Sequence, residues 1–341
     1  MRVVDYVGEG GPEVLRLAHR PVPVPQAGEV LVRVVAAGLN RPDVQQRRGL
    51  YPPPAGASDI PGLDLAGVVE QVAPDVTWPR PGDAVCAIVS GGAHAQYCAV
   101  PAVQCMPVPR GFSFVEAASL PEVFFTAWNN VIWLGRLGEG ESLLIQGGTS
   151  GVGLAAMQIA KKLRGSHVIA TAGSPQKRAV CLAHGAAAAI DYHDRDWPQK
   201  VRDAAPAAGI DLILDGQAGD YTQPHMQLLA PDGRLVLIAS HRGSEALLDL
   251  RAIVRRRLTV TGSTLRPRPP AYKGRIAHEL VMQVWPLLER GEIVTLIHAV
   301  FPMAQVADAH AMLDANEQIG KLVMVMEPDL AATRPGASGL P

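Results

Sequence analysis

The sequence predicts an α/β protein of two domains, one rich in β-strands and one built on a doubly wound parallel sheet. At 341 residues the chain is longer than a single typical core requires. Over residues 1–124, short β-branched runs alternate with Pro- and Gly-rich turns, which is typical of an all-β unit. Over 125–265, apolar runs alternate with helical segments, which indicates a parallel sheet with crossover helices.

The expected elements of the second domain follow in regular order. Strands are predicted at 142–146 and 167–172 and in the runs "AAAAIDY", "IDLILDG", "GRLVLIAS" and "LTVTGSTL", with a helix over 153–163. The run "IAHELVMQVWPLLERG" predicts a helix that Pro286 must kink or break. The strand, helix and strand that follow return to the first domain, which then comprises 1–124 and 266–330. From Glu327 the chain has few apolar residues, and we expect 331–341 to be a flexible tail.

The composition is that of an ordinary soluble globular protein. The formal net charge is −1 with 18% charged residues, so nucleic acid is not the expected partner. No apolar run approaches the roughly 20 residues that cross a bilayer, and we expect a cytoplasmic location without membrane attachment. The four cysteines stand at unrelated spacings without a CxxC pair, which favours reduced thiols over disulfides or a zinc site.

A glycine loop between a buried strand and a helix predicts dinucleotide binding. In "LLIQGGTSGVG" (143–153), Gly148, Ser150 and Gly153 have the spacing of the dinucleotide fingerprint, with serine in place of the second glycine. Gly148 is expected to permit the tight turn and Gly153 the close packing of helix and strand. The N–H groups of Gly151 and Val152 at the helix start would then meet the diphosphate.

The end of the next strand favours NADPH over NADH. The acid that usually grips the ribose hydroxyls of NAD is replaced by Ala172, which removes a repulsion against a 2′-phosphate. Ser174 offers a hydroxyl and Lys177 a positive charge, and Tyr192 ends the third strand. The alternatives are that Lys177 is a solvated helix-start lysine and Tyr192 a packing residue.

Several motifs in register resemble one superfamily over residues 1–327. They are "AAGLNRPDVQQRRGLYP", "PGLDLAGVV", "RPGDAV", "FFTAWNNV", "GGTSGVG", "TAGSPQK" and "GKLVM". These are similar to the zinc-free quinone oxidoreductase branch of the medium-chain dehydrogenases/reductases, the zeta-crystallin-like proteins, and within it to the subgroup inducible by the p53 tumour suppressor. The resemblance implies a GroES-like catalytic domain, a Rossmann domain that binds NADPH, and a homodimer.

The positions that hold zinc in zinc-dependent members of that superfamily carry asparagine, leucine and aspartate here. A cysteine would be expected near Asn40 and a His-Glu pair near Leu63 and Asp64. Because leucine cannot bind a metal, we expect no metal site. Without a Lewis acid, alcohol oxidation is disfavoured, whereas quinones and conjugated carbonyl compounds remain suitable hydride acceptors.

The resemblance also implies which residues line the reaction site. Tyr51 would donate a hydrogen bond, or a proton, to the acceptor oxygen, and Asn40 would orient it. Asp43 either lines this site or organises its loop. Around the nucleotide, contacts are implied for Thr126, Ser150, Ser263, Thr264, Leu265, Asn316 and Lys321. A helix hydroxyl bonded to its own backbone is the alternative for Thr126, and a simple glycine replacement is the alternative for Ser150.

Three functions remain open from the sequence. The first is an NADPH-dependent quinone oxidoreductase, with Tyr51, Asn40 and Ser150 at the catalytic site. The second is an NADPH-dependent reductase of activated alkenes such as enones or enoyl thioesters. The third is an NADPH-binding protein without catalysis, since the basic residues of 255–257 and 266–275 could form an RNA-binding patch, although no stacking aromatics accompany them.

Overall fold

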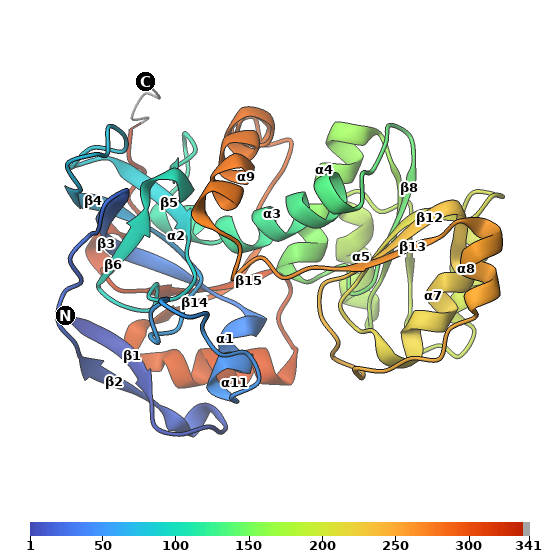
Figure 1. Ribbon diagram of the computed structural model, residues 1–341, viewed down its shortest axis with the longest axis horizontal. Coiled ribbons are helices and arrows are strands. Elements are labelled where there is room, and N and C mark those ends of the chain that lie inside the picture. The colour runs from blue at the N-terminus through green and yellow to red at the C-terminus, as the bar shows by residue number, and fades with distance from the viewer. Residues whose placement is uncertain (337–341) are drawn as a thin grey trace. The chain divides into compact units, whose positions relative to one another are not determined.

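The computed structural model describes residues 1–336 and divides the chain into two compact units (Figure 1). One unit combines Met1–Phe125 with the chain from Arg266 onward, and the other is Thr126–Leu265. The first unit is therefore formed from both ends of the chain, with the second inserted between them. Each unit has its own sheet and its own core.

The first unit is built on a seven-stranded sheet. The strands follow the order β14-β15-β3-β4-β5-β7, and β6 also pairs with β3. Most neighbours are antiparallel, whereas β14 and β15 run parallel. The bounds are β3 (Glu29–Leu39), β4 (Asp64–Val72), β5 (Ala84–Ile88), β6 (Tyr97–Pro101), β7 (Cys105–Pro107), β14 (Ile297–Pro302) and β15 (Lys321–Val325). A separate hairpin joins β1 (Arg2–Tyr6) to β2 (Leu15–His19). The strands β14 and β15, from the C-terminal part of the chain, thus belong to the same sheet as β3.

The helices of the first unit lie between and after these strands. Its long helix ends at Gln283 and a short one begins at Trp285, which confirms the break expected from Pro286. A short helix also occupies the start of the expected loose segment, where Ala331 is buried at 8% exposure. Residues 337–341 of the predicted flexible tail lie outside the described residues. The helices are α1 (Arg41–Arg47), α2 (Phe114–Ala118), α9 (Pro270–Gln283), α10 (Trp285–Glu289), α11 (Val306–Ala315) and α12 (Pro328–Ala331).

The second unit contains the predicted doubly wound parallel sheet. Its six strands follow the order β10-β9-β8-β11-β12-β13, and every pairing is parallel. The chain leaves β8 toward β10 and then returns to β11 on the other side of β8. The strand order therefore reverses beside β8, where ligands of open α/β sheets bind. The bounds are β8 (Ser142–Ile145), β9 (His167–Thr171), β10 (Ala188–Ile190), β11 (Ile210–Asp215), β12 (Leu229–Leu237) and β13 (Thr259–Gly262).

Helices alternate with these strands, as parallel connections require. They are α4 (Gly151–Arg164), α5 (Pro175–Ala183), α6 (Trp197–Ala204), α7 (Thr222–Leu228) and α8 (Leu250–Arg256). The helix α3 (Pro121–Ala127) spans the boundary of the two units and continues into the π-helical segment η3 (Trp128–Leu134). Within residues 1–336, no helix is both long and apolar enough to cross a membrane. The expected cytoplasmic location stays a prediction.

Candidate nucleotide and acceptor sites

The glycine loop after β8 has the close packing that the sequence predicts. The residue with the left-handed backbone conformation, however, is not the one expected. The left-handed backbone of the turn falls on Gly147, with φ of +85°, and not on Gly148 as expected. At Gly148 a Cβ atom would lie 2.7 Å from Ala170 Cβ and 2.8 Å from Cys181 Sγ. At Gly153 it would lie 2.7 Å from the carbonyl oxygen of Gly147. These glycines are therefore needed because no side chain fits there.

Ser150 is the N-cap of α4. Its Oγ accepts a hydrogen bond from the Gly153 N–H at 3.0 Å and donates one to the Gly147 carbonyl at 2.9 Å. This capping closes the loop and fixes the start of the helix. The N–H groups of Gly151 and Val152 belong to the first helical turn, where backbone donors lack intrahelical acceptors and the dipole favours an anion. The loop and helix start thus form a cradle with the chemistry that a diphosphate needs.

The end of β9 brings together three of the predicted phosphate contacts. Ser174 is the N-cap of α5, and its Oγ accepts from the Lys177 N–H at 3.2 Å. The hydroxyl of Tyr192 lies against Gly173, where a Cβ atom would be only 2.5 Å away from it. Burial raises the pKa of Tyr192, so its hydroxyl keeps its proton and can donate. The N-terminus of α5, with Lys177 in its first turn, and the hydroxyls of Ser174 and Tyr192 therefore lie at the strand end that carries the neutral Ala172.

An ion pair that was not predicted from the sequence lies in the same region. Arg178 Nη1 donates to Asp191 Oδ2 at 2.6 Å. Asp191 precedes Tyr192, so this end of the sheet does carry an acid. A hydrogen bond from the His193 backbone and the charge of Arg178 lower the pKa of Asp191. Arg178 offsets the negative charge that this carboxylate would present to a phosphate. The sequence feature that could have indicated this ion pair is the adjacent pair of basic residues at 177–178.

Asn130 connects two of the predicted nicotinamide contacts and was also missed. Its Nδ2 donates to the Thr126 carbonyl at 2.8 Å, and its Oδ1 accepts from Ser263 Oγ at 2.6 Å. Asn130 is 1% exposed. Thr264 and Leu265 follow Ser263 after the end of β13, and Thr264 is exposed. Their cofactor contacts, like those of Thr126 and Ser263, stay predictions.

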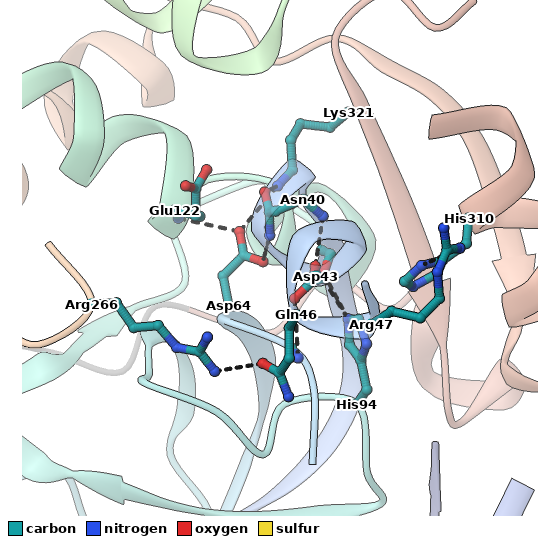
Figure 2. A network of polar contacts seen from close by, with 12 residues as sticks. Asn40, Asp43, Gln46, Arg47, Asp64, His94, Glu122, Arg266, His310 and Lys321 are labelled. Carbon is teal, nitrogen blue, oxygen red and sulfur yellow. Dashed lines mark hydrogen bonds and ion pairs between the residues drawn. The ribbon is translucent and has the colours of Figure 1, made fainter. Parts of the chain in front are cut away.

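In the first unit, Asn40 belongs to a buried polar cluster with Asp64 and Lys321 (Figure 2). Asn40 Nδ2 donates to Asp64 Oδ1 at 2.7 Å, and Lys321 Nζ donates to Asn40 Oδ1 at 2.5 Å and to Asp64 Oδ2 at 3.2 Å. The Glu122 backbone N–H also donates to Asp64, at 3.2 Å. The ammonium group thus lies on the side-chain oxygens of Asn40 and Asp64, the positions at which the sequence was compared with zinc-dependent members of the superfamily. Among residues 1–336, no group of three or more His, Cys, Asp or Glu could hold a metal ion.

This arrangement changes the interpretation of Lys321. The sequence suggested that it reaches the nucleotide, whereas the structure buries it at 4% exposure on Asn40 and Asp64. Its observed partners are therefore those of the Asn40 cluster. Asn316 is exposed, ends α11 in a left-handed conformation and receives a hydrogen bond from Arg41 at 3.4 Å. A nucleotide contact by either residue stays a prediction.

Asp43 organises the loop after Asn40. It is 1% exposed and accepts hydrogen bonds from the Asn40 N–H at 2.7 Å and the Gly62 N–H at 3.2 Å. Burial raises the pKa of Asp43, although the nearby His94 opposes the shift. The residue therefore ties α1 to the loop that precedes Asp64. Of the two roles left open by the sequence, the structure shows the organising one.

Tyr51 lies half-buried in the loop after α1, in the same unit as Asn40. Its carbonyl accepts from Arg266 Nη1 at 3.1 Å, and the Arg266 guanidinium carbon lies 5.3 Å from the centre of its ring. The basic residues that suggested an RNA-binding patch are split between the two units. Arg257 pairs with Asp232 in the second unit, whereas Arg266 and Lys273 are buried in the first. Because Arg266 and Lys273 are buried, these two residues cannot contribute to a basic surface patch.

Comparisons with known proteins place these sites in a family. Residues 26–110 match the alcohol dehydrogenase GroES-like domain, and residues 151–280 match the zinc-binding dehydrogenase domain. The chain is 31% identical to the synaptic vesicle membrane protein VAT-1 homolog of Rattus norvegicus, over 96% of this chain and 85% of that protein. It is 28% identical to the quinone oxidoreductase of Rattus norvegicus, over 96% and 98%. The chain belongs to the medium-chain dehydrogenase/reductase superfamily.

Solved structures of this superfamily have the same fold. A mycobacterial protein complexed with NADPH is 27% identical with a TM-score of 0.83, over 96% of this chain and all of that one. An NAD-dependent alcohol dehydrogenase is 32% identical with a TM-score of 0.83, over 96% and 100%. The CurK enoyl reductase is 25% identical with a TM-score of 0.83, over 95% and 99%. The α/β fold with GroES-like and Rossmann-type domains is thus confirmed, whereas coenzyme and substrate differ among these relatives.

Proposed function

We propose that this medium-chain dehydrogenase/reductase is an NADPH-dependent oxidoreductase that reduces quinones without a metal ion. The observation that carries the proposal is the end of β9, where Ser174, Lys177 and Tyr192 surround a neutral strand end. The relatives named quinone oxidoreductase and the NADPH complex of a structural relative support it.

The residues of the second unit fit the proposed nucleotide. The N–H groups of Gly151 and Val152 would hold the diphosphate, in a cradle that a Cβ atom at Gly148 or Gly153 would fill. Lys177, Ser174 and Tyr192 would hold the 2′-phosphate. Ser263, Thr264 and Leu265 would bind the carboxamide, and Thr126 would contact the ribose. NADPH, when bound, supplies the hydride.

The first unit supplies the groups proposed for the acceptor. Asn40 is fixed by Asp64 and Lys321 and would orient the acceptor, while Tyr51 would donate a proton to the acceptor oxygen. Because Lys321 neutralises Asp64 in place of a metal, this site is suited to acceptors that stabilise negative charge themselves. A quinone does so because its reduced ring is aromatic. The acceptor therefore needs positioning more than Lewis-acid activation.

The experiment is to mix the protein with NADPH and a panel of quinones and follow absorbance at the nicotinamide band. The proposal predicts turnover of at least some quinones and slower turnover with NADH. Tight NADPH binding without turnover of any acceptor would favour the non-catalytic NADPH-binding protein. Faster turnover with NADH than with NADPH would contradict the assignment of the β9 end as the site of the 2′-phosphate.

Reduction of an activated alkene is the second candidate, because the chain shares its fold with the CurK enoyl reductase. In that reaction Tyr51 would protonate the carbon next to the carbonyl after hydride addition to the other alkene carbon. A quinone and an enone of matched size, compared by product analysis, separate the two candidates. Faster turnover of the enone would reverse their order.

We also propose that two copies of the chain associate through the β13 edge. Among the described strands, β13 pairs only with β12 and ends the sheet. Nearby segments expose apolar side chains, with Leu247 at 92%, Leu250 at 68% and Val254 at 77% exposure. An exposed strand edge with apolar neighbours favours pairing with a twofold mate. Sedimentation should give a dimer at micromolar concentration, and Val254→Asp should weaken it.

A further inference from the structure

Arg266 is a buried arginine whose three nitrogens reach three different segments of the first unit. It is 6% exposed. Nε donates to the Ser90 carbonyl at 2.8 Å, Nη1 to the Tyr51 carbonyl at 3.1 Å and Nη2 to Gln46 Oε1 at 2.6 Å, the last seen in Figure 2. Only a planar guanidinium can serve three acceptors in these fixed directions at once. Arg266 therefore fixes the Tyr51 loop against α1 and the segment after β5.

A second buried cation, Lys273, supports this contact through Ser90. It is 2% exposed. Lys273 Nζ donates to Ser90 Oγ at 2.8 Å and to the Arg266 carbonyl at 3.3 Å, and Ser90 Oγ itself donates to that carbonyl at 2.8 Å. The side chain of Lys273 thus fixes the backbone of Arg266, while Arg266 fixes the backbone of Tyr51.

Within residues 1–336, neither of these two cations has a carboxylate as a hydrogen-bond partner, although the charge of Asp43 acts on Arg266. Over the described part of the chain, all the hydrogen bonds of Arg266 and Lys273 go to neutral oxygens. Burial lowers the pKa of Arg266, and burial with the charge of Arg266 lowers the pKa of Lys273 to about 8. Buried charges are ordinarily paired because desolvation is costly. Two buried cations that lack a directly hydrogen-bonded carboxylate, one of them in contact with a predicted catalytic tyrosine, therefore call for a functional explanation.

We propose that Arg266 is the positioning residue for Tyr51 and that Lys273 holds Arg266 in place through Ser90. The inference rests on the proposed function, in which Tyr51 gives its proton to the reduced acceptor. The guanidinium carbon lies 5.3 Å from the centre of the Tyr51 ring, within cation–π range. One planar group thus contacts both the backbone and the ring of Tyr51. A carboxylate on Arg266 would compete for its nitrogens and would cancel the positive field near an oxygen that gains negative charge.

A double-mutant cycle tests whether Arg266 acts through Tyr51. Tyr51→Phe removes the hydroxyl, and Arg266→Met removes the three hydrogen bonds while keeping bulk. Each should lower kcat roughly 10- to 100-fold with the KM for NADPH nearly unchanged. In the Tyr51→Phe background, Arg266→Met should cost little more. Arg266→Lys should recover only part of the loss. If the fold-reductions in kcat of the two single variants multiply in the double variant, Arg266 does not act through Tyr51, and the inference is overturned.

A readout without catalysis keeps this test separate from the proposed function. Hydrogen exchange of the amides in 49–58 should speed up in Arg266→Met and, less strongly, in Lys273→Met. Arg268→Met is the matched control, because the Arg268 guanidinium lies over the ring of Tyr272, 4.9 Å from its centre. If the wild type turns over no acceptor, the proposed function fails, yet exchange still decides whether Arg266 fixes the loop. Unchanged exchange in Arg266→Met would overturn the inference.

The charge of Lys273 can be followed by pH. Its ammonium faces Arg266 and Ser90, and Arg266 in turn feels Asp43, Tyr51 and Tyr6. Between pH 8 and 10.5 the folded protein holds Lys273 neutral while the unfolded chain protonates it, so this group makes stability rise with pH. Unfolding at a pH between these two values should therefore take up protons at this group. Lys273→Met should remove that uptake, and an unchanged uptake would contradict burial of the charge beside Arg266.

Discussion

The two candidate sites are stabilised in different ways. In the second unit, the hydroxyls of Ser150 and Ser174 cap helices through bonds to backbone groups three residues away. In the other unit, Asn40 reaches Asp64, 24 residues away, and Lys321, 281 residues away. The first site is a local property of strand-loop-helix segments. The second exists only when distant parts of the chain have folded together.

The two sites also differ in the solvent exposure of their charged side chains. Lys177 is half-exposed at the start of α5, where solvent moderates the cost of a charge. Asp64 and Lys321 are 0% and 4% exposed and depend on each other. We therefore expect substitutions in the Asn40 cluster to act mainly on stability, and substitutions at the β9 end to act mainly on coenzyme affinity.

The largest effect is expected from Lys321→Met. It removes the partner of a buried carboxylate, which leaves Asp64 charged and uncompensated. Breaking a buried pair in this way costs about 3–5 kcal/mol of unfolding free energy, measured by urea denaturation. The double variant Asp64→Asn with Lys321→Met should recover much of that loss. A loss of unfolding free energy below about 1 kcal/mol, as for exposed ion pairs, would contradict the burial of the Lys321–Asp64 ion pair.

Lys177→Ala should act on the coenzyme instead. Losing a charged hydrogen bond to the 2′-phosphate should weaken NADPH binding roughly 10-fold and leave NADH binding unchanged. Titration calorimetry with both coenzymes measures this difference. Lys161→Ala, in the last turn of α4, is the control and should change neither affinity. Equal weakening of NADPH and NADH would contradict a 2′-phosphate contact.

The serine caps should affect both stability and binding. Ser150→Ala and Ser174→Ala should each cost about 1 kcal/mol of stability and weaken NADPH binding several-fold. Ser113 caps α2 in the other unit through Glu116. Ser113→Ala should therefore have a similar effect on stability and none on NADPH affinity. Loss of NADPH affinity in Ser113→Ala would contradict the expectation that only the helix caps of the second unit affect NADPH binding.

The smallest effect is expected from Arg178→Gln. It exposes the charge of Asp191 to the bound 2′-phosphate, but the pair is partly exposed and solvent screens it. The ratio of NADPH to NADH affinity should fall about 3-fold, in line with the worth of an exposed ion pair. Adding Asp191→Asn should restore the ratio. No restoration would mean that Arg178 itself contacts the phosphate.

The sequence predicted most of the fold because the periodicity of its segments is local. The six strands of the parallel sheet, the break at Pro286 and the return of the C-terminal strands were all visible as patterns of apolar residues, proline and glycine. The helix α12 was missed because it has only four residues and buries little apolar surface. The turn was assigned to Gly148 because adjacent glycines cannot be distinguished without the backbone conformation.

The sites were only partly predictable, for a related reason. Ser174, Lys177 and Tyr192 could be chosen because they stand at the ends of consecutive strands. The burial of Lys321 on Asn40 and Asp64 could not, because nothing in the sequence fixes the distance between positions 40 and 321. The contacts of Arg266 could not be predicted for the same reason, because Gln46, Tyr51 and Ser90 each lie more than 170 residues from it in the sequence.

The central claim is that this chain passes hydride from NADPH to an acceptor that needs no metal. The most direct measurement is quinone reduction by protein dialysed against a chelator, with zinc counted in the same sample and NADPH compared with NADH. We predict undiminished turnover, zinc far below one ion per chain, and higher kcat/KM for NADPH. One zinc per chain with activity lost on its removal, or higher kcat/KM for NADH, would contradict the account.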